Sequence, residues 1–213
     1  MGVLEDLLER PERDSLRSGA VTQLGIGLNA AGHYADALSV MEAELSMSLG
    51  SPEHSILVTQ SNLARTYRML ERFEEALRVR QDVYSRILKL HGEQHRDTLE
   101  EANNYATSLG ELQRYAEAKS LLGKAMPRAR RVFGDNSETT LRLRWTYAQT
   151  LYKDTGATLD DLREAVSTLE ETAQTAKCVL GGAHPLATAI ADALEKSRAA
   201  LRSRKTQPPS GSA

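Results

Sequence analysis

The chain has 213 residues and a formal net charge of −2, from 27 basic and 29 acidic side chains. This balance gives no overall electrostatic case for nucleic acid or a membrane surface, and we expect neither as a partner. A single cysteine excludes an intrachain disulfide, and no apolar run approaches the roughly 18 residues that a membrane-spanning helix needs. The start of the chain, MGVLEDLLER, lacks the order of a signal peptide, so we expect a cytoplasmic protein.

Hydrophobic residues make up 40% of the chain but aromatic residues only 5%, which suits helices that pack closely on small side chains. The first predicted element is a short helix at residues 3–9, stopped before Pro11. Residues 1–13 are therefore interpreted as a short N-terminal helix and a linker, ahead of a repeat domain at 14–203.

Four landmarks recur through that domain in one register: a small residue, an aromatic residue, an alanine and a glycine. In the second copy they are Ala64, Phe73, Ala76 and Gly92. In the third copy they return 42 residues later (106 − 64), as Ala106, Tyr115, Ala118 and Gly134. The first copy has Gly25, Tyr34, Ala37 and Gly50, and the fourth has Ala148, Ala165 and Gly181 around an insertion of five residues.

Each copy reads as a helical hairpin, because apolar residues recur at three- and four-residue spacing on both sides of a short break. The predicted hairpins cover 14–50, 51–92, 93–134 and 135–181, followed by a capping helix at 185–203 and a disordered tail at 204–213. The small residues mark the points where the two helices of a hairpin cross, since close approach requires small side chains. The fold class is therefore all-α.

The ends of the helices carry their own signals. Gly32 can take a left-handed conformation between the first two helices, whereas the second and third breaks contain no glycine. Ser51 followed by Pro52 reads as an N-cap and a first helical residue. Asp97, three residues before Glu100, reads as a capping-box-like pair at the next first helix.

The order of these residues resembles the tetratricopeptide repeats of the kinesin light chain type, over roughly residues 18–202. The resemblance is carried by Asn62-Leu63-Ala64, Tyr67, Phe73, Glu75-Ala76, Leu180-Gly181 and His184-Pro185. It implies a right-handed α-solenoid of about four hairpins that binds peptides or proteins. The His-Pro pair is complete only at 184–185, and the long heptad segment of kinesin light chains is missing, so we do not expect a kinesin subunit.

In similar repeats the first helices of the hairpins line a concave groove that holds a peptide. Transferred to this sequence, the peptide-binding groove consists of Asn29, Ser61, Asn62, Arg65, Arg68, Asn103, Asn104, Thr107, Trp145, Gln149, Tyr152 and Lys153, with Thr22, Ile26, Met69, Glu111 and Thr146 beside them. Asparagine side chains both donate and accept hydrogen bonds, which suits an extended peptide backbone. The alternative is that these positions are merely solvated helix faces.

The groove composition leaves two questions open. Arg65, Arg68 and Lys153 could attract an acidic extended segment, together with Arg142, but acidic residues lie between them. Trp145 is the only tryptophan, and it could serve either as an exposed anchor for a partner or as packing between helices.

The remaining candidates indicate no chemistry. Cys178 is expected to be a buried small residue rather than a reactive thiol. His91 and His95 flank a helix-breaking glycine without a third ligand, so no metal is expected, and the basic run at 128–131 is not matched by a nucleic-acid motif.

The sequence shows no phosphate loop, nucleophile elbow or paired catalytic residues, and we expect no cofactor and no enzymatic activity. It therefore predicts a non-enzymatic scaffold that binds a partner peptide or protein. The alternative is a peptide-sensing regulatory protein that changes conformation on binding. A homo-oligomer is left open.

Overall fold

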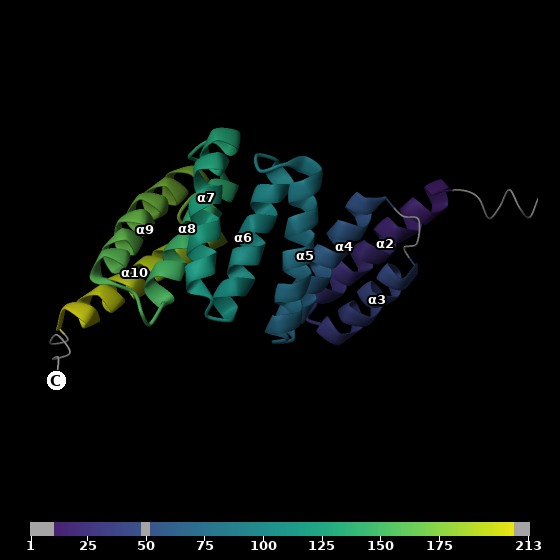
Figure 1. Cartoon of the computed structure of the whole chain (residues 1–213), viewed down its shortest axis with the longest axis horizontal. Helices are drawn as coiled ribbons and strands as arrows, with labels where there is room; N and C mark the ends of the chain where they lie inside the picture. Colours follow the sequence, from purple (N-terminus) through teal and green to yellow (C-terminus); the bar gives the residue numbers. More distant parts are fainter. Residues whose placement is uncertain (1–10, 48–51, 207–213) are drawn as a thin grey trace, which may run out of the picture. The chain divides into compact units, whose positions relative to one another are not determined.

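The computed structural model describes residues 11–47 and 52–206. Within those ranges the chain forms nine α-helices, α2 to α10, and no strand (Figure 1). Their bounds are α2 Pro11–Ala30, α3 Tyr34–Met47, α4 Glu53–Met69, α5 Phe73–His91, α6 Arg96–Glu111, α7 Tyr115–Phe133, α8 Glu138–Lys153, α9 Leu159–Leu180 and α10 Pro185–Thr206. The all-α solenoid of paired helices with a last single helix is confirmed.

Two expected boundaries shift. Helix α2 already begins at Pro11, so residues 11–13 belong to a helix rather than to a linker. Proline suits this place because the first turn of a helix leaves its N–H groups unbonded in any case. Helix α10 continues to Thr206, so residues 204–206 are helical rather than part of the tail. The predicted helix at 3–9 and the rest of the tail lie outside the described residues.

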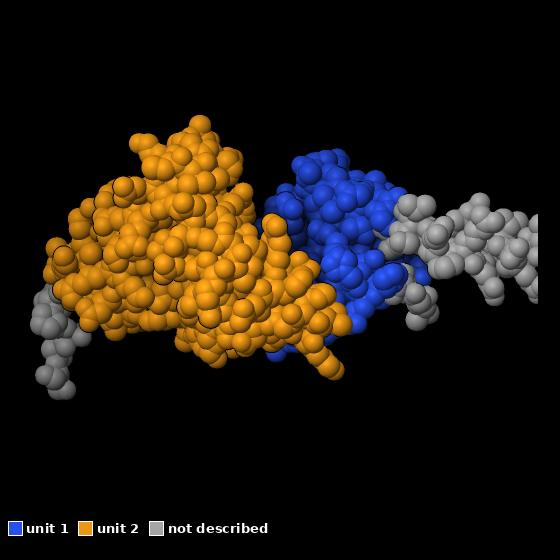
Figure 2. Space-filling model, turned by 90° about the horizontal axis from the view of Figure 1, so that it is seen from above, with its two compact units in different colours: residues 1–87 blue, residues 88–213 orange. Residues whose placement is uncertain are grey.

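The chain divides into two compact units, residues 1–87 and 88–213, which Figure 2 shows in blue and orange. In the first unit α2 packs on α3 and on α4, and α3 packs on α4. In the second unit each helix from α6 to α10 packs on the next. There the first helices of successive hairpins also touch, α6 with α8 and α8 with α10, so they share a face.

The core is built from the small residues that the repeat register identified. Ala37, Ala64, Ala76, Ala106, Ala118, Ala148 and Ala165 are all at most 1% exposed. In the first hairpin Gly25 takes the corresponding place, and a Cβ there would come within 2.6 Å of Met41 Cε. Close approach of the paired helices at these positions is therefore confirmed, and it explains why so few aromatic residues suffice.

Three of the hairpin turns have the same geometry with different residues. Gly32, Glu71 and Gln113 all have positive φ, at 82°, 59° and 58°. In each turn the next residue donates its backbone N–H to a carbonyl five residues earlier, at 2.9 Å, as from Arg72 to Tyr67. This is the Schellman arrangement that ends a helix on a left-handed residue. The second and third turns thus lack glycine, as predicted, but take a strained conformation.

The fourth hairpin uses a different turn because of its insertion. Asp154 Oδ1 accepts from the backbone N–H of Gly156 at 2.8 Å, and α9 then starts with a capping box. In that box the Thr158 hydroxyl accepts from Asp161 N at 3.1 Å, and Asp161 Oδ2 accepts from Thr158 N at 3.0 Å. The extra residues are therefore accommodated without a left-handed residue.

The starts of the first helices correct the cap assignments. Helix α6 is capped by His95, whose Nδ1 accepts from Asp97 N at 3.3 Å, so Asp97 is not the cap. His184 Nδ1 accepts from Leu186 N at 3.2 Å at the start of α10, and Ser137 caps α8. Pro52 stands at the cap position of α4 rather than inside it, and Ser51 lies outside the described residues. At the starts of α6 and α10 an imidazole nitrogen thus takes the place of the usual cap oxygen, whereas α8 keeps a serine oxygen.

Candidate functional site

Polar residues on the first helices of the first unit are largely engaged in packing. Thr22 and Thr59 share a hydrogen bond of 3.0 Å between α2 and α4, and Asn29 Nδ2 donates to Thr66 Oγ1 at 2.8 Å. Thr22 and Asn29 are only 7% exposed. The structure therefore places these two expected groove residues between the helices rather than on an open face.

The expected groove residues of α4 behave differently from one another. Ser61 accepts a hydrogen bond from Arg80 of α5, and Asn62 Nδ2 donates to the Val58 carbonyl of its own helix at 3.0 Å. Arg65 is exposed and Arg68 half-buried, with its guanidinium 3.9 Å from the Met69 sulfur. Of these residues only Arg65 is fully available on the surface.

The second unit has a polar pocket of about 350 Å³ between α6 and α8. It contains two of the expected groove residues, Asn103 and Asn104, and Arg142, which the sequence had suggested as an attractor for acids. The full lining is Arg96, Glu100, Asn103, Asn104, Glu138, Thr139 and Arg142. Its size is at the lower end of the range in which ligand sites occur. This is the candidate site, and we call it the α6/α8 pocket.

Asn103 is the unusual member of the α6/α8 pocket. It is 6% exposed, and its Oδ1 has no hydrogen-bond partner among the described residues. Its backbone carbonyl accepts from the Thr107 hydroxyl at 2.9 Å, so the unsatisfied oxygen is that of the side-chain amide. A buried acceptor without a donor costs about 1–3 kcal/mol. The neighbouring Asn104 differs, because its Nδ2 donates to Glu101 Oε2 at 3.1 Å.

The charged side chains of the pocket form two ion pairs, one on each helix. Arg96 Nε lies 2.9 Å from Glu100 Oε1 on α6, and Arg142 pairs with Glu138 on α8. On α6 the arginine precedes the glutamate, whereas on α8 the glutamate precedes the arginine. The net charge of the four side chains is zero. Arg142 is therefore already neutralised by its own helix.

The remaining expected residues lie further along α8. Trp145 is half-buried, and its indole Nε1 is a buried donor without a partner among the described residues, so the packing interpretation fits it better than that of a fully exposed anchor. Tyr152 is half-buried, and burial first, then Asp192 of α10, raises the pKa of its hydroxyl to about 12. Gln149 is half-buried and Lys153 is exposed. None of these four lines the α6/α8 pocket.

Three lining residues, Arg96, Glu138 and Thr139, were missed in the sequence. Arg96 and Glu138 are 42 residues apart (138 − 96), so they occupy the same place in successive repeats. A search of the repeat register for i, i+4 charge pairs would have found both, since each has an opposite charge four residues later.

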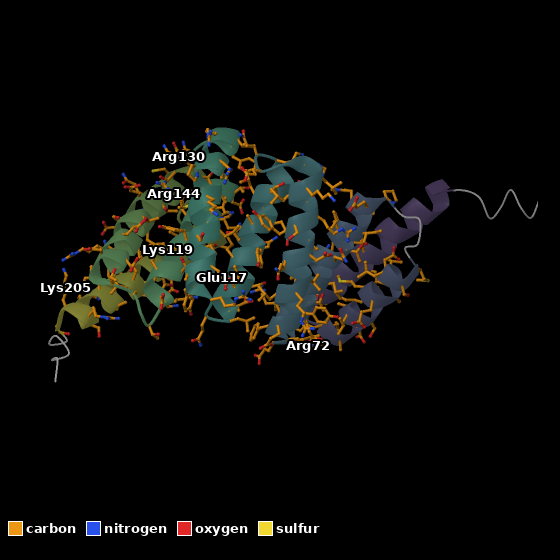
Figure 3. All side chains as sticks on the ribbon, viewed as in Figure 1. Arg72, Glu117, Lys119, Arg130, Arg144 and Lys205 are labelled. Atoms are coloured by element: carbon orange, nitrogen blue, oxygen red, sulfur yellow. The ribbon has the colours of Figure 1, made fainter. Side chains whose placement is uncertain are left out.

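The second helices carry ion pairs that stabilise the second unit. Lys119 of α7, labelled in Figure 3, donates to Asp161 Oδ1 of α9 at 2.5 Å. This bond, with those from Thr158, lowers the pKa of the Asp161 carboxyl. The basic run is also engaged, since Arg128 pairs with Glu93 and Arg130 lies 2.5 Å from Asp135.

The expectation for Cys178 is wrong, because its side chain is exposed. The residue lies in the last turn of α9, two residues after the fully buried Ala176, and so it is on the opposite side of the helix. His91 and His95, which flank Gly92, stack with their ring centroids 4.3 Å apart. None of the helices described here has the length and apolar character to cross a membrane.

The comparisons with known proteins agree with this architecture. The family model of the tetratricopeptide repeat matches residues 56–97 and 98–138. Two crystal structures of nearly identical tetratricopeptide-like repeats, assigned to a kinesin light chain of Podosopora anserina, are each 20% identical to the chain. Their TM-scores are 0.74 and 0.72, covering 89% and 92% of this chain and 88% and 90% of theirs.

A third similar structure is BtubC (BKLC) from P. vanneervenii, with 13% identity, a TM-score of 0.62, and coverage of 97% of this chain and 88% of that one. No curated protein matches the chain in sequence. At these identities the structural matches establish the fold, while the family model identifies the two central repeats. Residues 56–138 therefore match two tetratricopeptide repeats, and the fold of the chain is similar to that of kinesin light chain-like repeat structures.

Proposed function

We propose that the protein is a non-enzymatic scaffold that binds a peptide segment of a partner protein, with the α6/α8 pocket as an anchoring point. Repeats of this family mediate protein–protein interaction in general, and their fold is typical of scaffolds. The single observation that carries the assignment to this pocket is the unsatisfied, nine-tenths buried Asn103 oxygen.

The composition of the face supports a polar peptide as the ligand. Asn103 and Asn104 lie side by side in the chain and both line the pocket, so their amides offer donors and acceptors next to each other. Helices α6 and α8 belong to packed hairpins, and a site on rigid helices is held more precisely than one on loops. Because Arg142 and Arg96 are paired, the pocket does not present a free positive charge to the ligand.

The test is affinity capture with the full chain and a variant in which the pocket is filled. Thr139→Trp places an indole at a half-buried lining position, and it should abolish capture of the partners that the unchanged chain retains. Ser120→Trp is the matched control, because Ser120 is exposed on the second helix α7 and should leave capture unchanged.

Identical sets of captured proteins from the unchanged chain and from Thr139→Trp would show that partners do not bind at this pocket. The same capture with Arg65→Glu tests the first unit, where Arg65 is the exposed expected groove residue. Loss of partners only in that variant would move the site to α4.

A further inference from the structure

The α6/α8 pocket also carries information about which side chain of a partner it accepts, an inference that rests on the proposed function. Acidic ligands are poorly suited to it. A carboxylate entering the pocket would meet Glu100 and Glu138 as well as the two arginines, and it would have to displace a carboxylate that is already paired. Both ion pairs are exposed to solvent, which screens them, so an acid gains little from the arginines and is opposed by the two glutamates.

A cationic side chain meets the same difficulty with the signs reversed. Arg96 and Arg142 lie in the same lining, and their charges oppose a lysine or arginine that approaches the two glutamates. A neutral group is repelled neither by the two glutamates nor by the two arginines. What the pocket offers to a neutral group is the Asn103 Oδ1 acceptor, together with the guanidinium and hydroxyl donors of Arg96, Arg142 and Thr139.

The depth of the Asn103 oxygen favours a side-chain amide of the partner over its backbone N–H as the hydrogen-bond donor. Asn103 is 94% buried, since only 6% of it is exposed. An extended peptide runs over a helix surface, so a group that protrudes from it reaches further into a pocket than its own backbone N–H. Oδ1 accepts a donor directly, or after a rotation about the last side-chain bond of Asn103 that exchanges the positions of its oxygen and nitrogen.

We propose that the α6/α8 pocket selects a primary carboxamide, the side chain of glutamine or asparagine, in the partner segment. Its NH₂ donates to Asn103 Oδ1, and its carbonyl accepts from the arginine or threonine donors of the rim. The two hydrogen bonds run in opposite directions, which matches a lining that combines one unsatisfied acceptor with several donors.

The test uses bead-bound libraries of short peptides that share one central residue and have randomised flanks. The central residue is glutamine, asparagine, glutamate, lysine or alanine, and the bound fraction of the labelled full chain is measured on each. One satisfied hydrogen bond predicts about two- to tenfold stronger binding to the glutamine and asparagine beads than to the other three. Alanine beads present the same main chain without a side-chain amide, so they distinguish binding of a side-chain amide from binding of the backbone amides.

Asn103→Leu should remove the preference, while the matched variant Ser120→Leu should keep it. Ser120 is exposed on the second helix α7 and lies outside the pocket lining. Equal binding to glutamine and alanine beads, stronger binding to glutamate beads, or a preference that survives in Asn103→Leu would each overturn the carboxamide proposal and leave peptide binding intact. Binding to none of the libraries would overturn both proposals.

Discussion

The first helices of the two units use their polar residues in different ways. In the first unit the Thr22–Thr59 and Asn29–Thr66 hydrogen bonds join α2 to α4. In the second unit Asn103 of α6 is equally buried but lines a pocket, and its side-chain oxygen, like that of Asn29, has no partner among the described residues. A polar position on a first helix is therefore no sign of a binding role by itself. The side chain across the interface decides whether that residue holds the array together or is available to a ligand.

The largest effect is expected from a core deletion in one unit. Leu141→Ala in α8 removes a side chain with 0% exposure, which should cost about 2–5 kcal/mol of unfolding free energy. Because repeats pass destabilisation mainly to their neighbours, amide hydrogen exchange should accelerate in residues 88–206 more than in 11–87. Leu57→Ala in α4 is the control, and it should give the opposite pattern. Equal acceleration of hydrogen exchange in both units would contradict the division of the chain into two units that open separately.

Removal of a buried polar group should change the unfolding free energy in opposite directions in the two units. Thr59→Val leaves the buried Thr22 hydroxyl without its partner and should lower the unfolding free energy by about 1–2 kcal/mol. Asn103→Leu removes an oxygen that is already unsatisfied, so stability should stay unchanged or rise by about 1 kcal/mol. Urea unfolding of the two variants measures both values. A loss of stability in Asn103→Leu similar to that in Thr59→Val would mean that Asn103 is structural.

The start of α9 gives the second unit a pH dependence. Lys119 and Thr158 lower the pKa of Asp161, so its folded-state pKa lies below the unfolded value of about 3.9. The stabilisation is then fully present above that value and is lost as the pH falls below it. Asp161→Asn should cost about 1–2 kcal/mol at neutral pH, and this cost should shrink steadily as the pH falls below about 3.9. Thermal unfolding against pH tests this, and parallel curves for the variant and the unchanged chain would refute it.

The smallest effect concerns the hairpin turns. Glu71 and Gln113 hold positive φ values that cost a non-glycine residue about 1–2 kcal/mol, whereas Gly32 takes the same conformation without that cost. Glu71→Gly, in the first unit, and Gln113→Gly, in the second, should each raise stability by up to about 1 kcal/mol after the entropy cost of glycine. Gly32→Ala should lower it. Unfolding midpoints of the three variants give the answer, and destabilisation by both glycines would mean that the turns are unstrained.

Much of the fold could be predicted because it depends on local pattern. The positions of Ala64, Ala106 and Ala148 indicated the crossing points, and Gly134 and Gly181 indicated where α7 and α9 end. These signals are local: a small side chain permits close approach, and glycine permits a left-handed residue. The caps at His95 and His184 were missed, because histidine is not among the usual cap residues and its role depends on which way the ring turns.

The sequence by itself determined the helices, their pairing into hairpins and the small-residue core, since each follows from spacing along one or two neighbouring helices. Only the tertiary structure decided that the amide nitrogen of Asn29 is bonded to Thr66, that the buried oxygens of Asn29 and Asn103 lack a partner among the described residues, and that Cys178 is exposed. These outcomes depend on which side chain the next hairpin presents. That partner is more than thirty residues away from Asn29 along the chain, and no repeat pattern specifies its polar atoms.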